Sequence, residues 1–367
     1  MQDFRTEIIT SNDGLERLRT EWDRIHACSR LATPFNTWAW MATWWQIFGR
    51  RRWRLHIVCI YSDGKLIGIV PLYRRRSWHG WTLRFLGTGE DENDEVVTEY
   101  CDFLVEAQAE PMITGMGWHF LIMAGGWSDF RTCNVLSDSI ISQTRADSVV
   151  RTSCGARYRM PLPQDWSDFL SGCSSNMRRQ IRLAERDAAQ AETSEEVIRD
   201  WNAGGADAFN ILGRLHQLRW QDKNAPGAFS STLFRDFHRE IVSQYAEETG
   251  SEIRIIRSSG EPVAALYNFR LRDTVYFYQS GVSPVAHFRS PGVYSHCKAI
   301  KSAIDDGIAF YDMMRGDLSS YKKRFPCEIT EMQNISLFRS SYRARLFVQT
   351  QNFVRWLRSS IMSKQNF

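Results

Sequence analysis

Apolar residues recur every three to four positions in several segments of the chain, a spacing that predicts amphipathic helices. Leu15, Leu18, Trp22 and Ile25 share one such face. Another segment carries Ile211, Leu215 and Leu218. The first of these faces belongs to a helix predicted at about Gly14–Ala27. Further helices are predicted at about Thr37–Phe48, Ser175–Ala191 and Ser231–Glu248.

Between these helices lie short runs rich in β-branched and aromatic residues, which predict strands. Trp53–Tyr61 and Leu66–Tyr73 flank an Asp63-Gly64 pair, and Asp-Gly favours a tight hairpin. The remaining strands are expected near Leu83–Leu86, Cys101–Val105, His119–Ala124, Glu252–Arg257, Val263–Leu271, Thr274–Val282 and Ile308–Met313. The mixture predicts an α/β fold with mixed, mostly antiparallel sheets flanked by helices.

Two hairpins in the sequence look like copies of each other. Ile57–Gly64 aligns with Ile253–Gly260, and the strands that follow, Leu66–Val70 and Pro262–Leu266, also match. Helices precede both hairpins. The repetition predicts an internal duplication, with one domain in each half of the chain.

Composition narrows the class of protein. The hydrophobic fraction of 43% is ordinary for a globular chain. No C-x-x-C pair occurs among the eight cysteines, so no metal site is expected. The N-terminal residues do not have the basic-then-apolar order of a signal peptide, and no apolar run reaches the length of a membrane span. The simplest expectation is a cytoplasmic protein.

Positive charge gathers at the C-terminal end. Residues 286–367 hold 13 Lys and Arg against 6 Asp and Glu, whereas the rest of the chain is slightly acidic. An amphipathic helix at about Tyr342–Met362 is predicted to carry part of this charge. It either packs on its own domain or lies on the inner face of an anionic membrane.

The order of elements after Ser231 is helix, three antiparallel strands, helix and strand. The final strand–helix–strand unit is a crossover, so its two strands should be parallel. The loop before the crossover helix contains Arg289 and leads to Pro291 and Gly292. Unpaired N–H groups and the helix dipole at such a place favour a phosphate. The alternative is an ordinary strand-to-helix loop.

Six segments in this half resemble the CelD-like acetyltransferase group of the GNAT superfamily, which is related to the Fem-type peptidyltransferases. The matching segments are SSNMRRQIRLAERD at 174–187, LHQLRW at 215–220, GEPVAALYNF at 260–269, YFYQSGVSP at 276–284, SPGVYSHCKAI at 290–300 and YDMMRGD…YKKRF at 311–325. Upstream, PFNTWAWMATWW and GKLIGIVPLY resemble the N-terminal halves of the same proteins. The resemblance implies two GNAT-like domains, at 1–165 (degenerate) and 166–335 (catalytic), followed by the helix at 336–367.

The resemblance also implies acetyl-CoA or another acyl-CoA as the acyl donor, with no metal. The residues expected to bind it are Gly281, Val282, Arg289, Ser290, Gly292 and Val293. A backbone N–H near Gly281 or Val282 should polarise the thioester carbonyl.

Proton transfer needs an acceptor for the incoming nucleophile and a donor for the departing thiolate. We predict Asp312 or Asp317 as proton acceptor or substrate anchor. The alternative for Asp312 is a purely structural role, in which it pairs with Arg315 or caps a turn. Tyr321 is the predicted proton donor, or else a packing residue. The related proteins have Gly-Asp-x-x-Tyr-Lys, whereas this chain has one more residue between Asp317 and Tyr321.

Four residues are predicted to contact the acceptor: Arg178, Arg182, Trp220 and Arg315. Arg178 and Arg182 recur at four-residue spacing on one helix face, which either grips an anionic acceptor or is simply solvated. Trp220 lies one helical turn from His216 and serves either as a platform or as a core residue.

The leading hypothesis is an acyl-CoA-dependent N- or O-acyltransferase that acts on a small molecule or on a cell-surface polysaccharide precursor. No nucleic-acid partner is expected. One alternative is a Fem-type transferase that uses aminoacyl-tRNA. The other is a non-catalytic GNAT-fold scaffold in polysaccharide biosynthesis or export.

Overall fold

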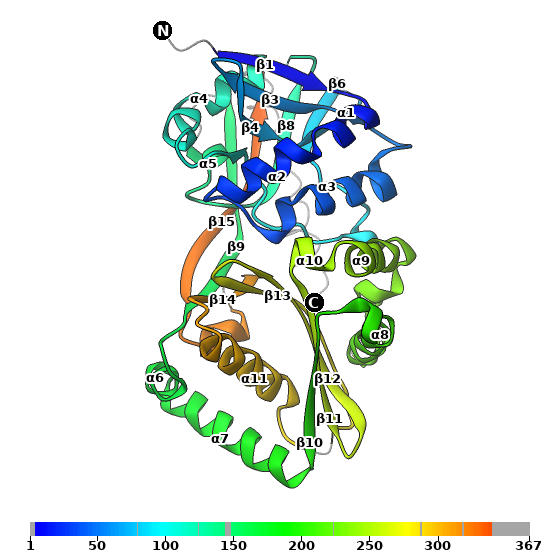
Figure 1. The fold of residues 1–367 in the computed structure, drawn as a ribbon, viewed down its shortest axis with the longest axis vertical. Coiled ribbons are helices and arrows are strands. Elements are labelled where there is room, and N and C mark those ends of the chain that lie inside the picture. The colour runs from blue at the N-terminus through cyan, green and yellow to red at the C-terminus, as the bar shows by residue number, and fades with distance from the viewer. Residues whose placement is uncertain are drawn as a thin grey trace, which may run out of the picture.

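The computed structural model describes residues 4–339, apart from 79, 124, 144–147, 223, 287 and 318. The chain forms two halves stacked along the long axis of the molecule, and strands β9 and β15 run through both (Figure 1). The predicted tail helix at 342–362 lies outside the described residues. Ser336–Phe338, expected to open the tail, instead end strand β15.

The N-terminal half contains nine strands and five α-helices within the described residues, β9 being shared with the other half. In order they are β1 (Phe4–Ile9), α1 (Asn12–Arg17), α2 (Arg19–Cys28), η1 (Pro34–Asn36), α3 (Trp38–Trp44), η2 (Trp45–Gly49), β2 (Arg54–Leu55), β3 (Ile57–Ser62), β4 (Lys65–Val70), β5 (Leu72–Ser77), β6 (Gly80–Phe85), η3 (Glu92–Asp94), β7 (Leu104–Val105), α4 (Glu110–Met123), β8 (Asp129–Leu136), α5 (Ile140–Gln143) and β9 (Val149–Pro161).

The C-terminal half contains the predicted helices and strands in the predicted order, and it also has α6, β10 and β15, which were not predicted. Its elements are α6 (Trp166–Gly172), α7 (Ser175–Gln190), β10 (Thr193–Ile198), η4 (Trp201–Ala203), α8 (Gly205–Gln221), η5 (Ala228–Ser230), α9 (Thr232–Gln244), α10 (Ala246–Thr249), β11 (Ser251–Ser258), β12 (Glu261–Leu271), β13 (Thr274–Val282), α11 (Pro291–Asp305), β14 (Phe310–Gly316), η6 (Tyr321–Arg324) and β15 (Glu328–Phe338).

Two sheets organise these strands. One has the order β1-β3-β4-β7, and the other runs across both halves as β10-β11-β12-β13-β14-β9-β15-β8-β6-β5-β2. Most neighbours are antiparallel, but β13 and β14 are parallel, as are β6 and β8. The predicted mixed, mostly antiparallel sheets are therefore confirmed, whereas the continuity of one sheet across the halves is new.

The predicted strand at His119–Ala124 is wrong. Glu110–Met123 form helix α4, which has Pro111 in its first turn, where a missing N–H costs nothing. The run is apolar on nearly every side, so its periodicity does not separate a helix from a buried strand. The first predicted helix forms as two consecutive helices, α1 and α2, on either side of Leu18.

Both predicted hairpins form with the same turn. Asp63 and Gly64 have φ of 49° and 80°, and Ser259 and Gly260 have φ of 49° and 84°. Two consecutive positive φ values define the type I′ turn that fits the twist of a two-residue hairpin. The Asp-Gly and Ser-Gly pairs are thus the local cause of each hairpin.

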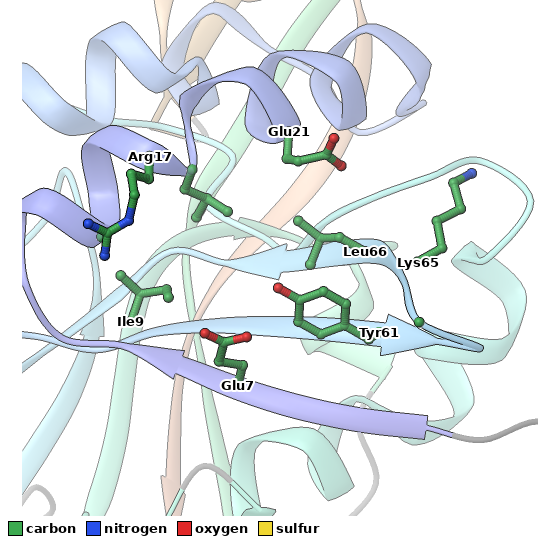
Figure 2. Close-up of a pocket in the computed structure, with 10 residues that line it drawn as sticks. Glu7, Ile9, Arg17, Glu21, Tyr61, Lys65 and Leu66 are labelled. Atoms are coloured by element: carbon green, nitrogen blue, oxygen red, sulfur yellow. The ribbon is translucent and has the colours of Figure 1, made fainter.

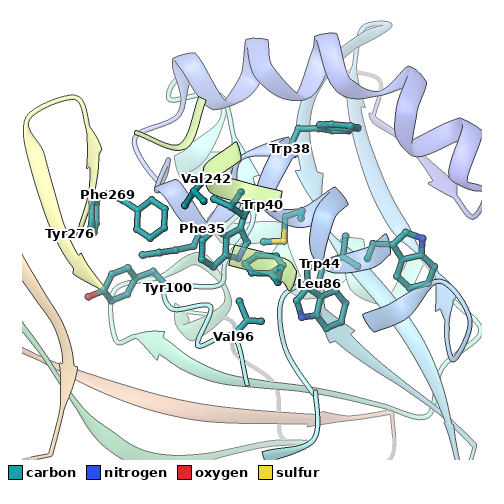
Figure 3. Close-up of a cluster of buried hydrophobic side chains, with 14 of the residues drawn as sticks. Phe35, Trp38, Trp40, Trp44, Leu86, Val96, Tyr100, Val242, Phe269 and Tyr276 are labelled. Carbon is teal, nitrogen blue, oxygen red and sulfur yellow. The ribbon is translucent and has the colours of Figure 1, made fainter. Parts of the chain in front are cut away.

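A hydrophobic core joins the two halves. Trp40 of α3 packs edge-to-face against Phe237 of α9 at 4.8 Å and against Phe269 of β12 at 5.5 Å between ring centroids. Figure 3 shows this cluster, in which Phe35 lies beside Phe269 and Tyr276. Aromatic pairs of this kind add about 1 kcal/mol each beyond their buried area. The halves are therefore packed together through side chains that belong to both.

Strand alternation gives the C-terminal part of the sheet two different faces. Tyr267 and Phe269 of β12 point toward α8, α9 and the N-terminal half, where they join the inter-half core. Leu266 points to the other face, into a cluster with residues of α7 and α11. We call the face toward the N-terminal half the inner face.

Candidate active site

Strands β13 and β14 pair briefly and then separate. Their parallel ladder contains only Thr274 with Phe310, Val275 with Tyr311, and Tyr276 with Asp312. β13 then continues to Val282, and β14 continues to Gly316. A register shift in the β12–β13 ladder follows Tyr267, and Met314 in β14 has a φ of 61°. The two irregularities accompany the divergence of the strands.

Helix α11 begins in front of this divergence. Its N-cap residue Ser290 has a left-handed backbone, with φ 54° and ψ 50°, and its side chain makes no capping hydrogen bond. Pro291 occupies the first turn, as predicted. We call residues 283–290 the donor loop. Of its residues, Phe288 is buried against Tyr294, which fixes the loop on the sheet.

The predicted donor-binding residues surround the start of α11. Val282 lies at the end of β13, and a Cβ added to Gly292 would stand 3.6 Å from Cγ2 of Val282, so the protein itself leaves room there. Val293 packs beside the core under α11. Arg289 is 77% exposed, and its Nε is 3.7 Å from Oδ2 of Asp187.

Gly281 has a packing reason to be glycine. A Cβ at this position would lie 2.5 Å from the backbone nitrogen of His216 and 2.6 Å from Cβ of Leu215, both in α8. The close approach of α8 to β13 therefore requires a residue without a side chain. Gly281 also pairs with Ala265 of β12, so its backbone belongs to the sheet.

The segment after β14 folds back onto that strand. Ser320 N donates to the carbonyl of Asp317, which forms a turn that takes up the extra residue before Tyr321. Lys322 Nζ donates to the carbonyls of Met313 (2.5 Å) and Arg315 (2.6 Å). Burial lowers the pKa of Lys322. Tyr321 is 44% exposed, and Asp317 is exposed.

A loop from the N-terminal half lies across both diverging strands. We call residues 86–103, between β6 and β7, the bridging loop. The Tyr278 hydroxyl of β13 donates to the carbonyl of Val96 in this loop. On β14, the backbone N–H of Arg315 donates to Glu99 Oε2 at 2.8 Å. The N-terminal half therefore supplies a wall of the site.

Glu99 is the functional candidate that the sequence did not reveal. Its side chain is almost fully buried, and burial raises its pKa to about 7. Arg315 and Lys322 partly oppose that rise through their positive charge. A carboxyl that titrates near neutral pH is suited to general base catalysis. In the sequence, Glu99 is one of several acids in an acidic stretch, and nothing marks it as the buried one.

Asp312 is the last residue of β14 that pairs with β13, and it lies on the inner face. Its side chain is fully buried; it accepts from Tyr100 Oη at 3.0 Å and from the backbone N–H of Met314 at 2.7 Å. Arg157 Nε donates to its other oxygen at 2.8 Å. The ion-pair partner is thus Arg157 of β9 rather than the expected Arg315, whose Nη1 donates to the carbonyl of Cys154.

A pocket of about 500 Å³ opens on the inner face at Asp312. Tyr276, Arg157 and Arg159 line it from the C-terminal part of the sheet, and Tyr100 and Leu31 line it from the N-terminal half. We call it the inter-half pocket. It brings Asp312 next to the point where β13 and β14 separate.

A second hollow of about 500 Å³ lies in the N-terminal half, between α1, α2 and the β3–β4 hairpin (Figure 2). Glu7, Tyr61 and Lys65 line it, with Arg17 and Glu21 on the helices. None of the predicted site residues lies there, so we assign it no part in the chemistry.

The predicted acceptor residues are not gathered at one place. Arg178 and Arg182 are on α7, which packs on the face opposite the inter-half pocket. Arg178 Nη1 donates to the carbonyls at the end of α6, including Ser171 at 3.3 Å. Trp220 is 37% exposed on α8, with its ring 5.9 Å from that of His216. Only Arg315 lies beside the diverging strands.

Comparison with known proteins identifies the domain. Residues 175–323 match the family model of the acetyltransferase (GNAT) domain. A search of curated protein sequences finds no match.

Solved structures resemble the chain over most of its length. The structure of FemX has a TM-score of 0.60 at 10% identity, covering 90% of this chain and 96% of that one. The C-terminal domain of a putative lysylphosphatidylglycerol synthetase from Agrobacterium fabrum has a TM-score of 0.55 at 10% identity, with coverages of 93% and 97%. A tandem GNAT protein from the clavulanic acid biosynthesis pathway has a TM-score of 0.50 at 10% identity, with coverages of 92% and 98%.

Fold and site thus define a class: the chain has two GNAT-like domains, and the second contains the acetyltransferase domain match. It is an enzyme of the GNAT acyltransferase type. The CelD-like subgroup expected from the sequence is not established by these comparisons. Within the described residues, no helix combines the length and apolarity needed to cross a membrane.

Proposed function

We propose that the protein transfers an acyl group from acyl-CoA, with acetyl-CoA as the first donor to test, to an amine or hydroxyl of an acceptor bound between the two halves. One observation carries the proposal: β13 and β14 pair over three residues and then separate in front of the N-terminus of α11. A thioester with an extended arm fits between strands that part, and its phosphates fit the uncapped helix start.

The donor site combines three features already described. The first turn of α11, with Ser290, Gly292 and Val293, offers backbone N–H groups to the pyrophosphate. Arg289 adds positive charge beside the helix start. Its ion pair with Asp187 is long, and the Arg289 side chain is exposed, so the pair holds the guanidinium only weakly. The edge of β13 that leads back from Val282 toward Tyr276 guides the arm and polarises the thioester carbonyl.

Proton transfer uses residues from both halves. The acceptor nucleophile attacks the thioester carbonyl, a C–N or C–O bond forms, and the C–S bond breaks. Glu99 takes the proton of the nucleophile, and Tyr321 gives a proton to the thiolate of CoA. A phenol is protonated at neutral pH, so Tyr321 has a proton to give. Asp317, exposed in the same turn, is the alternative proton acceptor.

Asp312 serves as an anchor in this scheme. Its three hydrogen bonds hold Tyr100 and Arg157 at the inter-half pocket. Both oxygens of the Asp312 carboxylate already accept hydrogen bonds from the protein, so the side chain is engaged in holding its neighbours. The acceptor is therefore proposed to enter through the inter-half pocket, where Asp312 fixes the side chains that line it.

A second function has a specific observation in its favour. The chain resembles FemX over 90% of its length, which supports transfer of an aminoacyl group from aminoacyl-tRNA as the alternative. The two donors are distinguished by binding. Acyl-CoA binding should be saturable at one site, whereas an aminoacyl-tRNA donor requires RNA binding that weakens steeply with salt.

Calorimetric titration with acetyl-CoA tests the proposal. We expect binding that Arg289→Glu weakens, because the substitution places a negative charge beside the phosphates. Absence of binding at millimolar acetyl-CoA, together with salt-sensitive RNA binding, would replace the proposal with the FemX-like alternative.

A further inference from the structure

We propose that the inter-half pocket holds an anionic group of the acceptor, a carboxylate or a phosphate, at the guanidinium of Arg159. This inference rests on the proposed function and names the class of acceptor. It starts from one row of side chains on the inner face of the sheet.

The row crosses three neighbouring strands. Tyr276 of β13 pairs with Asp312 of β14, and Asp312 pairs with Arg159 of β9. Paired residues of neighbouring strands point to the same face, so all three side chains point toward the N-terminal half. All three line the inter-half pocket. Neighbouring strands are about 4.8 Å apart, so Arg159 is about 10 Å from β13.

Most charged groups of the pocket are already occupied by the protein. Arg157 is paired with Asp312, and Arg30 with Glu110. Arg272 donates to the carbonyls of His26, Ala27 and Ser29 at the end of α2. Asp102 accepts from the backbone N–H groups of Ile140 and Ile141 at the start of α5. These groups shape the pocket but are engaged in internal bonds.

Arg159 differs from them. Its guanidinium carbon lies 3.4 Å from the ring centroid of Phe310, a cation–π contact that fixes its orientation. Its Nε is buried and has no hydrogen-bond partner among the described residues. In that part of the chain no carboxylate lies within ion-pair distance of it; Glu328, its neighbour on β15, is solvent-exposed. A buried N–H without an acceptor is costly, and a bound anion would satisfy it.

The guanidinium presents parallel N–H groups that match a carboxylate or a phosphate in two-point fashion. The acceptor would thus place its anionic group over β9 and extend its nucleophile toward the divergence of β13 and β14. Such an acceptor carries its anion about 10 Å from the amine or hydroxyl that is acylated.

The test uses the full chain with CoA present, so that the donor's phosphate positions are filled. Inorganic phosphate and propionate are titrated separately into the wild type, Arg159→Gln, Arg159→Lys and Arg214→Gln. Arg214 is exposed on α8 and does not line the pocket, so its variant controls for loss of one positive charge. Thermal unfolding checks that each variant is folded.

We expect at least one of the two anions to bind the wild type and the Arg214 variant alike. Arg159→Gln should weaken that binding at least about tenfold, the usual effect of losing a charge-assisted pair. Arg159→Lys keeps the positive charge but lacks the parallel N–H groups of the guanidinium, so it should weaken anion binding less than Arg159→Gln does. If Arg159→Gln does not fold, Arg159→Lys takes its place in the test. An effect on phosphate alone indicates a phosphate-bearing acceptor, and an effect on propionate alone indicates a carboxylate.

Two results would overturn the inference: neither anion binds the wild type, or binding is unchanged in the Arg159 variants. CoA binding is measured in the same preparations. If the wild type binds CoA and the Arg159 variants bind the anions as well as the wild type does, only the anion subsite is refuted. If the wild type does not bind CoA, the proposed function is refuted.

Discussion

The two halves of this chain build the same three-stranded unit in the same register. β1 pairs with β3 from Phe4–Ser62 to Ile9–Ile57, and β10 pairs with β11 from Thr193–Ser258 to Ile198–Ile253. Each hairpin has its register shift at the corresponding place, after Ile60 in one and after Ile256 in the other. The predicted duplication is therefore visible as matched hydrogen-bond ladders, beyond what similar turn residues would give.

The two halves differ in the strand that pairs next to each hairpin. In the C-terminal half, Gly281 and Val282 pair with Ala265 and Ala264. In the N-terminal half, the corresponding partners of Ile69 and Gly68 are Leu104 and Val105 of β7, a strand of only two residues. The chain leaves the small sheet after β4, forms β5 and β6, and returns through the bridging loop. This detour is what carries Glu99 to β14.

The segments before the following helices also differ. Ser283 N donates to Val263 O at 2.9 Å, and in the other half Glu106 N donates to Ile67 O at 3.0 Å. The donor loop that starts at Ser283 has eight residues, whereas only residues 106–109 separate β7 from α4. Glu106 brings a negative charge, paired with Arg24 and Lys65. A carboxylate at the position of a phosphate loop disfavours a nucleotide, so we infer a single donor site per chain.

The largest expected effect is on the transfer rate and comes from Glu99, which the N-terminal half contributes to the site of the C-terminal half. Glu99→Gln should lower the transfer rate about 100-fold or more, the usual contribution of a general base. In the wild type the rate should fall as pH drops below about 7, since the carboxyl then becomes protonated. The variant should lose this limb. A rate and pH profile equal to those of the wild type would show that the bridging loop is only structural.

The same carboxyl links stability to pH. Burial raises the pKa of Glu99 in the folded state from 4.5 to about 7, so the folded state holds its proton more tightly than the unfolded state. Its contribution to stability is therefore full below about pH 4.5 and declines as pH rises through 7. Denaturant unfolding from pH 5 to 8 should show a flatter decline in Glu99→Gln than in the wild type.

Gly281 and Leu104 occupy matched strand positions in the two halves, and substitutions at both should lower the free energy of unfolding for different reasons. Gly281→Leu, which copies Leu104, drives a side chain into the backbone of α8 and should cost about 3 kcal/mol or more in unfolding free energy. Leu104→Ala leaves a cavity in a fully buried site and should cost about 2–5 kcal/mol. If Gly281→Leu were as stable as the wild type, the close approach of α8 to β13 would be wrong.

A charge reversal at the donor loop should have a moderate effect. Arg289→Glu is expected to weaken acetyl-CoA binding about tenfold, because an exposed partner of a phosphate contributes modestly. Arg239→Glu, the same charge reversal at an exposed side chain of α9, is the control. Equal affinities in the two variants would place the pyrophosphate elsewhere.

The smallest effect is expected in the N-terminal half. Glu106→Gln removes a carboxylate that pairs with Arg24 and Lys65, which should lower stability slightly and leave the affinity for acetyl-CoA unchanged. Binding of a second acetyl-CoA molecule to this variant would show that the charge of Glu106 alone prevents donor binding in the N-terminal half. Isothermal titration resolves the number of sites directly.

Local chemistry explains what the sequence predicted well. Asp63-Gly64 and Ser259-Gly260 fix the hairpins, Pro291 starts α11, and Gly307, with a φ of 70°, ends it. Helix α4 was missed because its apolar residues have no clear period. The wall formed by Glu99 was also missed, as was the buried Nε of Arg159 that lacks a hydrogen-bond partner among the described residues. Both depend on which strands become neighbours across some 150 to 220 residues of sequence, and side-chain spacing carries no record of that.

The most direct test of the account is the stoichiometry of acetyl-CoA binding to the intact chain, measured by isothermal titration. The account predicts one site per chain, in the half where β13 and β14 separate before α11. Binding of two molecules, or no binding at millimolar acetyl-CoA, would contradict it.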